Sequence, residues 1–447
     1  MTGSLSVVAT EGTQAERIRP KERDTAINAL RTGVVPRVGL RHVQVGRVGE
    51  VAQVLRDVER IAGGGSAVRF VIGEYGSGKT FFLNLARSLA MEKKLVVVHA
   101  DLAPDRRLHA TGGQARGLYA ELMRNLSTRT RPEGGALASV VERFVTDAEK
   151  AARLSGAEVG EVVRERLGPV QDLVSGHDFA AVVVRYWEAS QAGDEATKTA
   201  ALRWLRGEYA LKTEARQMLG VRSVIEDSSV HDYLKVMGGF VRLAGYDGFL
   251  VVLDEMVNLF KLVHAQARNA NYEQILRIVN DVLQGSVEGV GFYFGGTPEF
   301  LMDTRRGLYS YEALRSRLAE NAFARDGLVD LTGPVLRLQA LRPEDVYVLL
   351  EKLRHLYAGG DAARHLVPDA ALPAFLEHCA KRIGDAYFRT PRNTIKAFLD
   401  LLAVLDQNPG ADWRALLGQV DIAPDAPSPG GDADDAAADD DLGTFRI

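Results

Sequence analysis

The sequence is poor in cysteine, and Cys379 is the one cysteine among its 447 residues. An intramolecular disulfide and a cysteine-rich zinc module are therefore both excluded. Long apolar runs are lacking too, since no stretch approaches the roughly 18–20 residues that a membrane-spanning helix needs. The first residues, MTGSLSVVATEGTQ, lack the charged-then-apolar pattern of a signal peptide. These absences predict a cytoplasmic protein with no membrane contact.

The net charge is small but unevenly distributed along the chain. The whole chain carries −4, whereas residues 421–447 hold eight aspartates and one arginine, a net of −7, which leaves +3 for the rest. Residues 17–47 hold eight lysines and arginines against two acidic residues. This balance permits contact with DNA without requiring it, because a dedicated DNA-binding protein has a much stronger basic footprint.

Five short runs rich in β-branched and aromatic residues predict buried strands. They cover residues 68–72, 95–100, 249–254, 291–295 and 335–339. Helical patterns alternate with these runs, and the first of them is the amphipathic segment 50–62. The alternation predicts an α/β fold with one five-stranded parallel sheet.

The rest of the chain divides where the pattern changes. Residues 17–340 contain all five strand runs, interrupted by a helical insertion at 103–245 with 20 basic and 19 acidic side chains, a balance in which a one-sided charged face can hide. Residues 341–420 predict a compact helical lid. Residues 1–16 and 421–447 have the composition of disordered tails. The helices expected in the insertion and lid cover 115–126, 137–154, 197–219, 343–357, 370–383 and 392–405.

Residues 73–80, GEYGSGKT, match the phosphate-binding pattern G-x-x-x-x-G-K-[ST] between a predicted strand and a predicted helix. Glycines let successive backbone N–H groups turn toward phosphate oxygens. Lys79 is expected to reach the β- and γ-phosphates, and the Thr80 hydroxyl to bind Mg²⁺. Phe81 and Phe82 fit core packing better than ligand contact. The nucleotide-binding candidates in this segment and directly after it are Gly73, Glu74, Tyr75, Gly76, Ser77, Gly78, Lys79, Thr80 and Phe81.

An acidic pair, Asp254 and Glu255, closes the third strand run. An apolar strand ending in Asp-Glu is the expected second half of a phosphate-loop site. The aspartate is expected to hold Mg²⁺, and the glutamate to orient or deprotonate the attacking water. Together with the Gly-rich segment, the pair predicts nucleotide hydrolysis rather than simple nucleotide storage.

Three further side chains are candidates for contact with the γ-phosphate or the attacking water. Thr297 ends the fourth strand run, where it either contacts the phosphate or caps the following helix. Arg315 and Arg317 lie on a predicted helix just before the last strand. From there, one of them is expected to reach the nucleotide of a neighbouring subunit. Arg315 is slightly preferred, and the alternative is a solvated helix face.

Arg392 follows Pro391 at the start of a predicted lid helix, where the helix dipole disfavours a positive charge. Such a placement against local preference invites a functional interpretation. The arginine is expected to reach from the lid to the γ-phosphate. The alternative is a structural ion pair.

The ordered set of motifs resembles the AAA+ superfamily, in its origin-recognition-like branch. The segment from Val45 to Glu50, which includes Arg47, is similar to the part of those proteins that lies against the adenine. More closely, the chain resembles the BrxD-like ATP-binding proteins of bacterial BREX phage-defence clusters. The segments that carry this likeness are RPKERDTAINALRTGVVPR, VGRVGE, RFVIGEYGSGKTFFL and ADLAPDRRLH.

The resemblance implies ATP as nucleotide, Mg²⁺ as cofactor, a homo-oligomer with sites between subunits, and a helicase-like partner. The chain departs from the branch in two ways. The separation of Lys79 from Asp254 is unusually long, and residues 406–420 are too few for a winged-helix domain. The resemblance therefore supports ATP hydrolysis better than direct DNA binding.

Two functions from different classes follow from these observations. The leading hypothesis is an ATPase, slow without a partner or DNA, that acts as motor, loader or switch on DNA-associated machinery. The alternative is a nucleotide-gated interaction protein that assembles with a helicase-like partner and does not itself engage DNA. The acidic C-terminal sequence ends in DDDLGTFRI, which either docks on a partner or only increases solubility.

Overall fold

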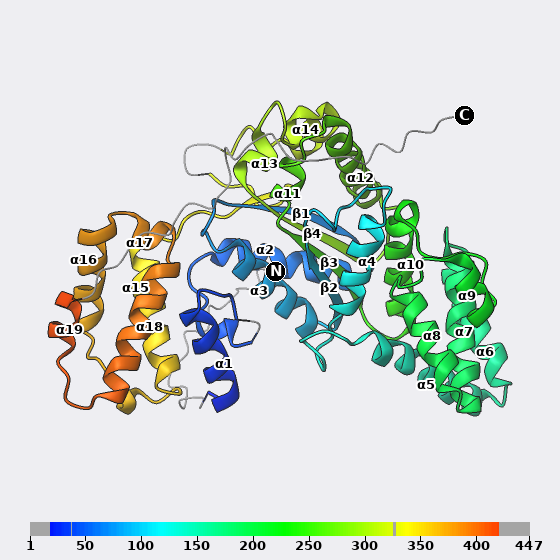
Figure 1. The fold of residues 1–447 in the computed structure, drawn as a ribbon, viewed down its shortest axis with the longest axis horizontal. Helices are drawn as coiled ribbons and strands as arrows, with labels where there is room; N and C mark the ends of the chain where they lie inside the picture. The colour runs from blue at the N-terminus through cyan, green and yellow to red at the C-terminus, as the bar shows by residue number, and fades with distance from the viewer. Residues whose placement is uncertain (1–17, 37, 325–327, 420–447) are drawn as a thin grey trace, which may run out of the picture.

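The computed structural model describes residues 18–36, 38–324 and 328–419 (Figure 1). The predicted tails at 1–16 and 421–447 lie outside these residues. The expected α/β fold is confirmed: five strands form one parallel sheet in the order β2-β3-β4-β1-β5. The strands are β1 (Ala67–Ile72), β2 (Leu95–Asp101), β3 (Gly248–Asp254), β4 (Val290–Gly296) and β5 (Val335–Arg337).

Each predicted strand is present, and only the last is shorter than expected, ending at Arg337. All strands are parallel, so their carboxyl ends meet at one edge of the sheet. At that edge Asp101 of β2 lies directly beside Asp254 of β3. Strand β4 lies between β1 and β3, so the segments that follow these three strands are neighbours.

Helices cover both faces of the sheet because successive strand residues point to opposite sides. Val71 packs in a core with α2 (Val48–Ala62) and α3 (Lys79–Glu92). Phe70 packs on the other face, in a core that includes residues of α4 (Gln114–Arg124), α10 (Val230–Leu243) and α12 (Ala265–Leu283). Three short helices complete this part: α11 (Val257–Phe260), α13 (Pro298–Met302) and α14 (Glu312–Leu318).

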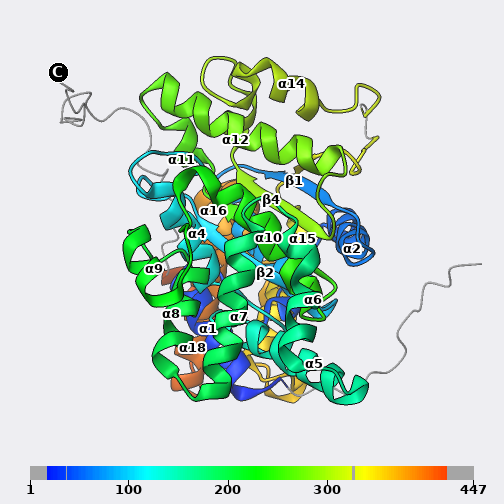
Figure 2. The same cartoon turned by 90° about the vertical axis from the view of Figure 1, so that its right-hand side faces the viewer.

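The predicted helical insertion is helical throughout its described elements, and its core continues into that of the sheet. Phe144, Phe179 and Phe240 pack together and belong to the same core as Phe249 and Val251 of β3. The single helix expected over 197–219 is wrong, because α8 ends at Leu205 and α9 begins at Lys212. Between α4 and α10 lie α5 (Leu137–Ser155), α6 (Val159–Gln171), α7 (Gly176–Ala192), α8 (Glu195–Leu205) and α9 (Lys212–Leu219), grouped on one side of the molecule (Figure 2).

The lid, residues 341–419, lies at the other end of the molecule and shares its core with the N-terminal segment, residues 18–45 (Figure 1). Ala26 and Ile27 of α1 (Pro20–Arg31) pack among lid residues, and Arg31 forms a 3.0 Å ion pair with Asp400. The basic N-terminal segment is thus a structural part of the lid. The lid helices are α15 (Pro343–Tyr357), α16 (Ala371–Ile383), α17 (Ala386–Arg389), α18 (Arg392–Gln407) and α19 (Trp413–Gln419).

A buried ion pair joins α2 to the sheet. Arg69 of β1 donates to both carboxylate oxygens of Asp57, at 2.6 and 2.7 Å, and Tyr293 of β4 donates to the same carboxylate at 2.9 Å. Arg69 also donates to the backbone oxygens of Leu331 and Thr332 just before β5. Because this network is almost fully buried, removing one member leaves an uncompensated charge.

No helix within the described ranges is both long and apolar enough to cross a membrane.

Candidate nucleotide-binding site

The Gly-rich segment 73–80, hereafter the P-loop, connects β1 to α3 at the carboxyl edge of the sheet. Gly76 and Gly78 adopt left-handed backbone conformations, with φ of 76° and 83°, which side chains rarely tolerate. The loop folds tightly, since a Cβ added at Gly73 would meet the Ser77 hydroxyl oxygen at 2.5 Å. The glycines of the motif are therefore needed for this backbone path.

Lys79 begins α3, and its ammonium group lies along the P-loop. Its Nζ donates to the backbone oxygens of Gly73 at 2.8 Å and Glu74 at 2.9 Å. Burial lowers the pKa of Lys79, and the negative charges of Asp254 and Glu255 partly oppose that shift. The lysine charge therefore lies between the P-loop and the acidic pair, where a phosphate chain would need it.

Thr80, Asp254 and Glu255 form a continuous chain of contacts. The Thr80 hydroxyl donates to Asp254 Oδ2 at 2.8 Å, and the Glu255 backbone N–H donates to Asp254 Oδ1 at 2.8 Å. These residues come from α3 and β3, and 174 positions of sequence separate Thr80 from Asp254. The insertion thus lengthens the chain between the two halves of the site without moving them apart.

Glu255 has an unusual backbone for a residue with a side chain, with φ of 56°. Partial desolvation raises the pKa of Glu255, and the neighbouring charges of Asp254 and Asp101 raise it further. Desolvation and then the charge of Asp254 also raise the pKa of Asp101. Sequence reasoning missed Asp101 as a member of this acidic group. Its position at the end of the strand run 95–100 was the available signal.

Gly295 explains how Asp254 fits beneath the P-loop. A Cβ added at Gly295 would lie 2.3 Å from Asp254 Oδ1 and 2.7 Å from a methyl carbon of Leu83 on α3. The backbone of β4 therefore leaves the space that the Asp254 carboxylate occupies between β3 and the P-loop helix.

Thr297 lies directly after β4, between the elements that carry the P-loop and Asp254. Its hydroxyl oxygen accepts from the Phe300 backbone N–H at 3.4 Å and so caps α13. In the structure Thr297 therefore caps α13, and its contact with a phosphate remains a prediction.

A cavity of about 400 Å³ borders the P-loop and is lined from three parts of the chain. The N-terminal segment and the lid contribute apolar side chains, among them Leu30, Val43, Leu349 and Ile395. The P-loop, Phe81 and Glu255 contribute the other wall. Phe82 is buried in the core beneath, as expected. The cavity therefore has one apolar and one polar end.

Arg47 lines the same cavity and connects the P-loop to the start of the lid. Its guanidinium donates to the backbone oxygen of Ser77 and, at 3.4 Å, to that of Gln339. Burial lowers the pKa of Arg47, against the opposing charges of Glu50 and Asp345. The segment from Val45 to Glu50 therefore borders the cavity, and Arg47 binds the backbone of the P-loop there.

The lid contacts the P-loop directly. A Cβ added at Gly76 would meet the Thr390 side chain at 2.8 Å. The Arg392 guanidinium lies 5.9 Å from the centre of the Tyr75 ring, and its side chain also lies close to Gly33. The predicted lid arginine is therefore beside the P-loop, at the boundary with the N-terminal segment.

Arg315 and Arg317 lie on α14, and neither lines the cavity at the P-loop. Arg317 is held by hydrogen bonds to Asn280 Oδ1 at 2.6 Å and to the Ala313 backbone oxygen at 2.8 Å. Arg315 is 57% exposed, and Glu312, 3.9 Å away, is its one ion-pair partner among the described residues. Of the two, Arg315 is the freer side chain.

The residues of the site fit a nucleotide with Mg²⁺. Thr80 Oγ1 and Asp254 Oδ2 are two oxygens brought together at the P-loop, and oxygen is the ligand that Mg²⁺ prefers. The buried Ser77 Oγ and Arg47 Nε have no hydrogen-bond partner within the described part of the chain. These polar atoms suit a cradle for an anionic group.

Comparison with known proteins agrees with this chemistry. The family model of the BREX system ATP-binding protein BrxC/D matches residues 18–421, which include every site residue described above. No curated protein matches the chain. The match confirms the BrxD-like resemblance and supports an ATP-binding role in BREX phage defence. The chain therefore belongs to the BREX system ATP-binding protein BrxC/D family.

Proposed function

We propose that this protein hydrolyses ATP with Mg²⁺ and uses the reaction as a motor, loader or switch on DNA-associated machinery of the BREX system. The observation that carries the proposal is the chain of contacts from Thr80 through Asp254 to Glu255, with Lys79 beside it. A site that only binds nucleotide needs Thr80, Asp254 and Lys79. The added glutamate is the feature that favours hydrolysis.

Each of these side chains has a distinct task in the proposed reaction. Lys79 places a positive charge against the phosphates, and Thr80 and Asp254 would hold Mg²⁺. When bound, Mg²⁺ neutralises charge that develops on the phosphate oxygens. Glu255 is proposed to accept a proton from the attacking water. Its raised pKa makes it a stronger base than a glutamate with the ordinary pKa. Its left-handed backbone, with φ of 56°, is proposed to help orient the carboxylate toward that water.

Three residues are proposed to report the phosphate state. Thr297 would contact the γ-phosphate or the water from the end of β4, and Arg392 would reach it from the lid. Arg315 would act on the nucleotide of a second copy, because Arg317 is already held by Asn280. This assignment requires a homo-oligomer. The helicase-like partner is proposed on the family resemblance alone.

The first test is ATP hydrolysis by the purified chain, with and without double-stranded DNA. Glu255→Gln should retain ATP binding and lose turnover, whereas Lys79→Ala should lose binding. Glu288→Gln is the matched control and should behave as wild type, because this glutamate is exposed and its one ion-pair partner among the described residues is Arg242. Turnover of Glu255→Gln equal to wild type would rule out the proposed base.

The second candidate function is a nucleotide-gated interaction protein. The observation in its favour is that the lid and N-terminal segment form one core and line the cavity together. Nucleotide binding there would change the position of the lid without any need for hydrolysis. Slow turnover indifferent to DNA, with ATP-dependent assembly retained in Glu255→Gln, would favour this function over the first.

A further inference from the structure

Arg47 differs from the other residues that line the cavity in both its backbone and its side chain. Its backbone is left-handed, with φ of 55°, a conformation that is strained in a residue with a side chain. Its charged side chain is partly buried, and the buried Nε has no hydrogen-bond partner within the described part of the chain. A strained backbone that the surrounding structure maintains indicates a specific task.

One nitrogen of Arg47 holds two backbone oxygens from different parts of the molecule. Nη2 donates to the oxygen of Ser77 in the P-loop and, at 3.4 Å, to that of Gln339. Because this nitrogen carries two N–H groups, it can serve both oxygens at once. Nη1 lies against the next residue of the P-loop, since a Cβ added at Gly78 would be 3.4 Å from it. The guanidinium therefore bridges the P-loop and Gln339.

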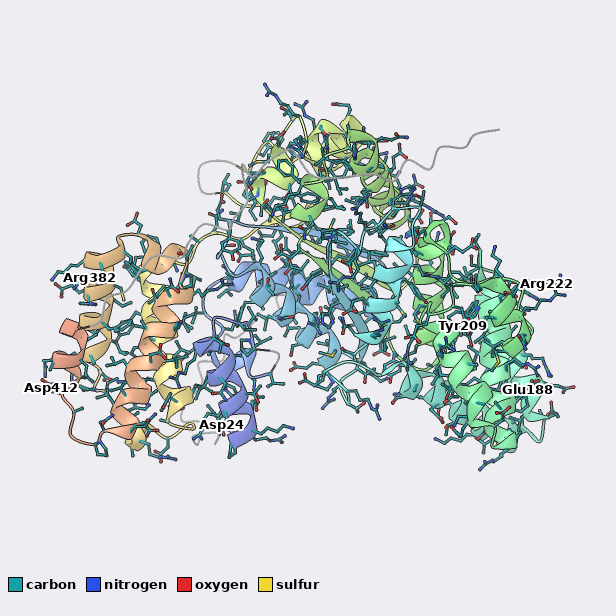
Figure 3. All side chains as sticks on the ribbon, viewed as in Figure 1. Asp24, Glu188, Tyr209, Arg222, Arg382 and Asp412 are labelled. Atoms are coloured by element: carbon teal, nitrogen blue, oxygen red, sulfur yellow. The ribbon has the colours of Figure 1, made fainter. Side chains whose placement is uncertain are left out.

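Gln339 is the residue at which the chain leaves the sheet for the lid. The residue before it, Leu338, still donates to the Ile72 backbone oxygen of β1 at 2.7 Å. Residues 339–342 then lead to α15 and the lid, at the end of the molecule where Arg382 lies (Figure 3). Movement of the lid relative to the sheet must therefore change the backbone at or near Gln339.

The second connection between the lid and the sheet contains Arg47 itself. Val45 packs against the core that the lid shares with the N-terminal segment, whereas Val51 of α2 packs against the core beneath the sheet. Between them Gly46 and Arg47 are both left-handed, with φ of 61° and 55°. Arg47 is thus part of one connection by its backbone and holds the other by its side chain.

We propose that Arg47 is a positioning residue that couples the phosphate site to the lid. The lid and the N-terminal segment move as one body about the two connections, since they share a core. Hinges of this kind absorb the movement in a few residues at the ends of elements. The bridge from Ser77 to Gln339 would pass the movement to the P-loop, and a nucleotide that shifts Ser77 would in turn move the lid.

Other contacts between the lid and the P-loop are less suited to this task. Thr390 lies against Gly76, and Arg392 lies 5.9 Å from the centre of the Tyr75 ring. Both contacts come from the lid, so they would separate when the lid turns away. Arg47 lies in a connection and can hold both oxygens in either lid position. The inference rests on the nucleotide-dependent lid movement of the second candidate function, and it is independent of hydrolysis.

The test measures the lid position in the full chain, between spin labels at Glu288→Cys near the sheet and Arg364→Cys in the lid. Both positions are exposed, whereas the native Cys379 is buried and should stay unlabelled. A saturating non-hydrolysable ATP analogue with Mg²⁺ should shift the distance between the labels. In Arg47→Met the shift should be lost even at saturation, and the analogue should bind roughly 10- to 100-fold more weakly, as expected for the loss of charged hydrogen bonds.

Two further variants control for charge and for folding. Arg47→Lys keeps the charge but loses the planar fork, so it should also lose the shift. Arg60→Met replaces an exposed arginine of the same helix, α2, and should keep both the shift and the affinity. Saturable binding of the analogue by the Arg47 variants shows that they are folded.

Three results would overturn the proposal, and each has a different meaning. Weaker binding by Arg47→Met with a full shift at saturation would show that Arg47 contacts the nucleotide without moving the lid. A full shift in Arg47→Lys would show that a charge is sufficient without the bridge. No shift in the labelled chain with Arg47 intact would overturn the lid movement itself, and with it the basis of this inference.

Discussion

The substitution Gly295→Ala tests the site without replacing any residue proposed to bind the nucleotide or Mg²⁺. The added Cβ would lie 2.3 Å from Asp254 Oδ1, whereas such contacts are essentially never shorter than 3.0 Å. The carboxylate must therefore move by at least about 0.7 Å. The backbone of β4 has little room to move instead, because the added Cβ would also lie 2.7 Å from a methyl carbon of Leu83. Both hydrogen bonds of Asp254, to Thr80 and to the Glu255 backbone, depend on its present place.

The size of the effect follows from those contacts. A hydrogen bond to a charged group contributes about 1.5–3 kcal/mol. Misplacing the carboxylate that is proposed to hold Mg²⁺ should therefore weaken Mg²⁺-dependent ATP binding by roughly 10- to 100-fold, at about 1.4 kcal/mol for each factor of ten. Overpacking of this kind costs about 1–3 kcal/mol of folding stability, so the chain should still fold.

The assay is titration of a fluorescent ATP analogue, with Mg²⁺ and with EDTA. Gly295→Ala should differ from wild type in Mg²⁺ and approach it in EDTA, since the Asp254 contribution is then absent in both. Gly168→Ala, where an added Cβ meets nothing within 4 Å, is the control. Equal affinities of the Gly295 variant and wild type in Mg²⁺ would refute the role assigned to the Asp254 carboxylate.

Three further predictions concern stability and turnover. Arg69→Met should lower the free energy of unfolding by about 3–5 kcal/mol in urea titration, because it leaves the Asp57 carboxylate buried and uncompensated; a loss below 1 kcal/mol would contradict this. Thr297→Ser should keep both stability and turnover. Thr297→Val should lose the helix cap, at a cost of about 0.5–2 kcal/mol in stability, and should also slow hydrolysis; unchanged hydrolysis would show that the hydroxyl acts as a cap alone. Arg315→Ala should reduce turnover by about 10³-fold or more with ATP affinity retained. Arg317→Ala should instead loosen α14 from α12, and normal turnover in both variants would exclude an arginine acting between subunits.

The sheet was predictable because its strands are buried on both faces. Runs such as 249–253 are continuously apolar, and polar residues follow directly at the carboxyl edge, so the strand and the site can be recognised together. Asp254 and Glu255 were identified this way. Asp101 escaped because its place beside Asp254 depends on the order β2-β3, which the sequence does not state.

The helical parts were less predictable, since amphipathic patterns do not show where a helix ends. Gly207, with φ of 71°, follows the end of α8 within what reads as one helix over 197–219. Likewise, nothing local in α1 indicates that its apolar side packs on the lid. That contact joins Arg31 to Asp400 across 369 positions, a distance over which patterning carries no signal.

The shared core of α1 and the lid has a consequence for synthesis. Translation at about 5–20 residues per second separates the appearance of Arg31 from that of Asp400 by roughly 20–70 s. Until the lid is made, the apolar side of α1, with Ala26 and Ile27, lacks most of its packing partners, whereas the sheet is complete once β5 has been synthesised. The apolar end of the cavity is therefore the last part to form. A ribosome-bound chain stalled before α18 should have an intact P-loop and an unfinished pocket above it.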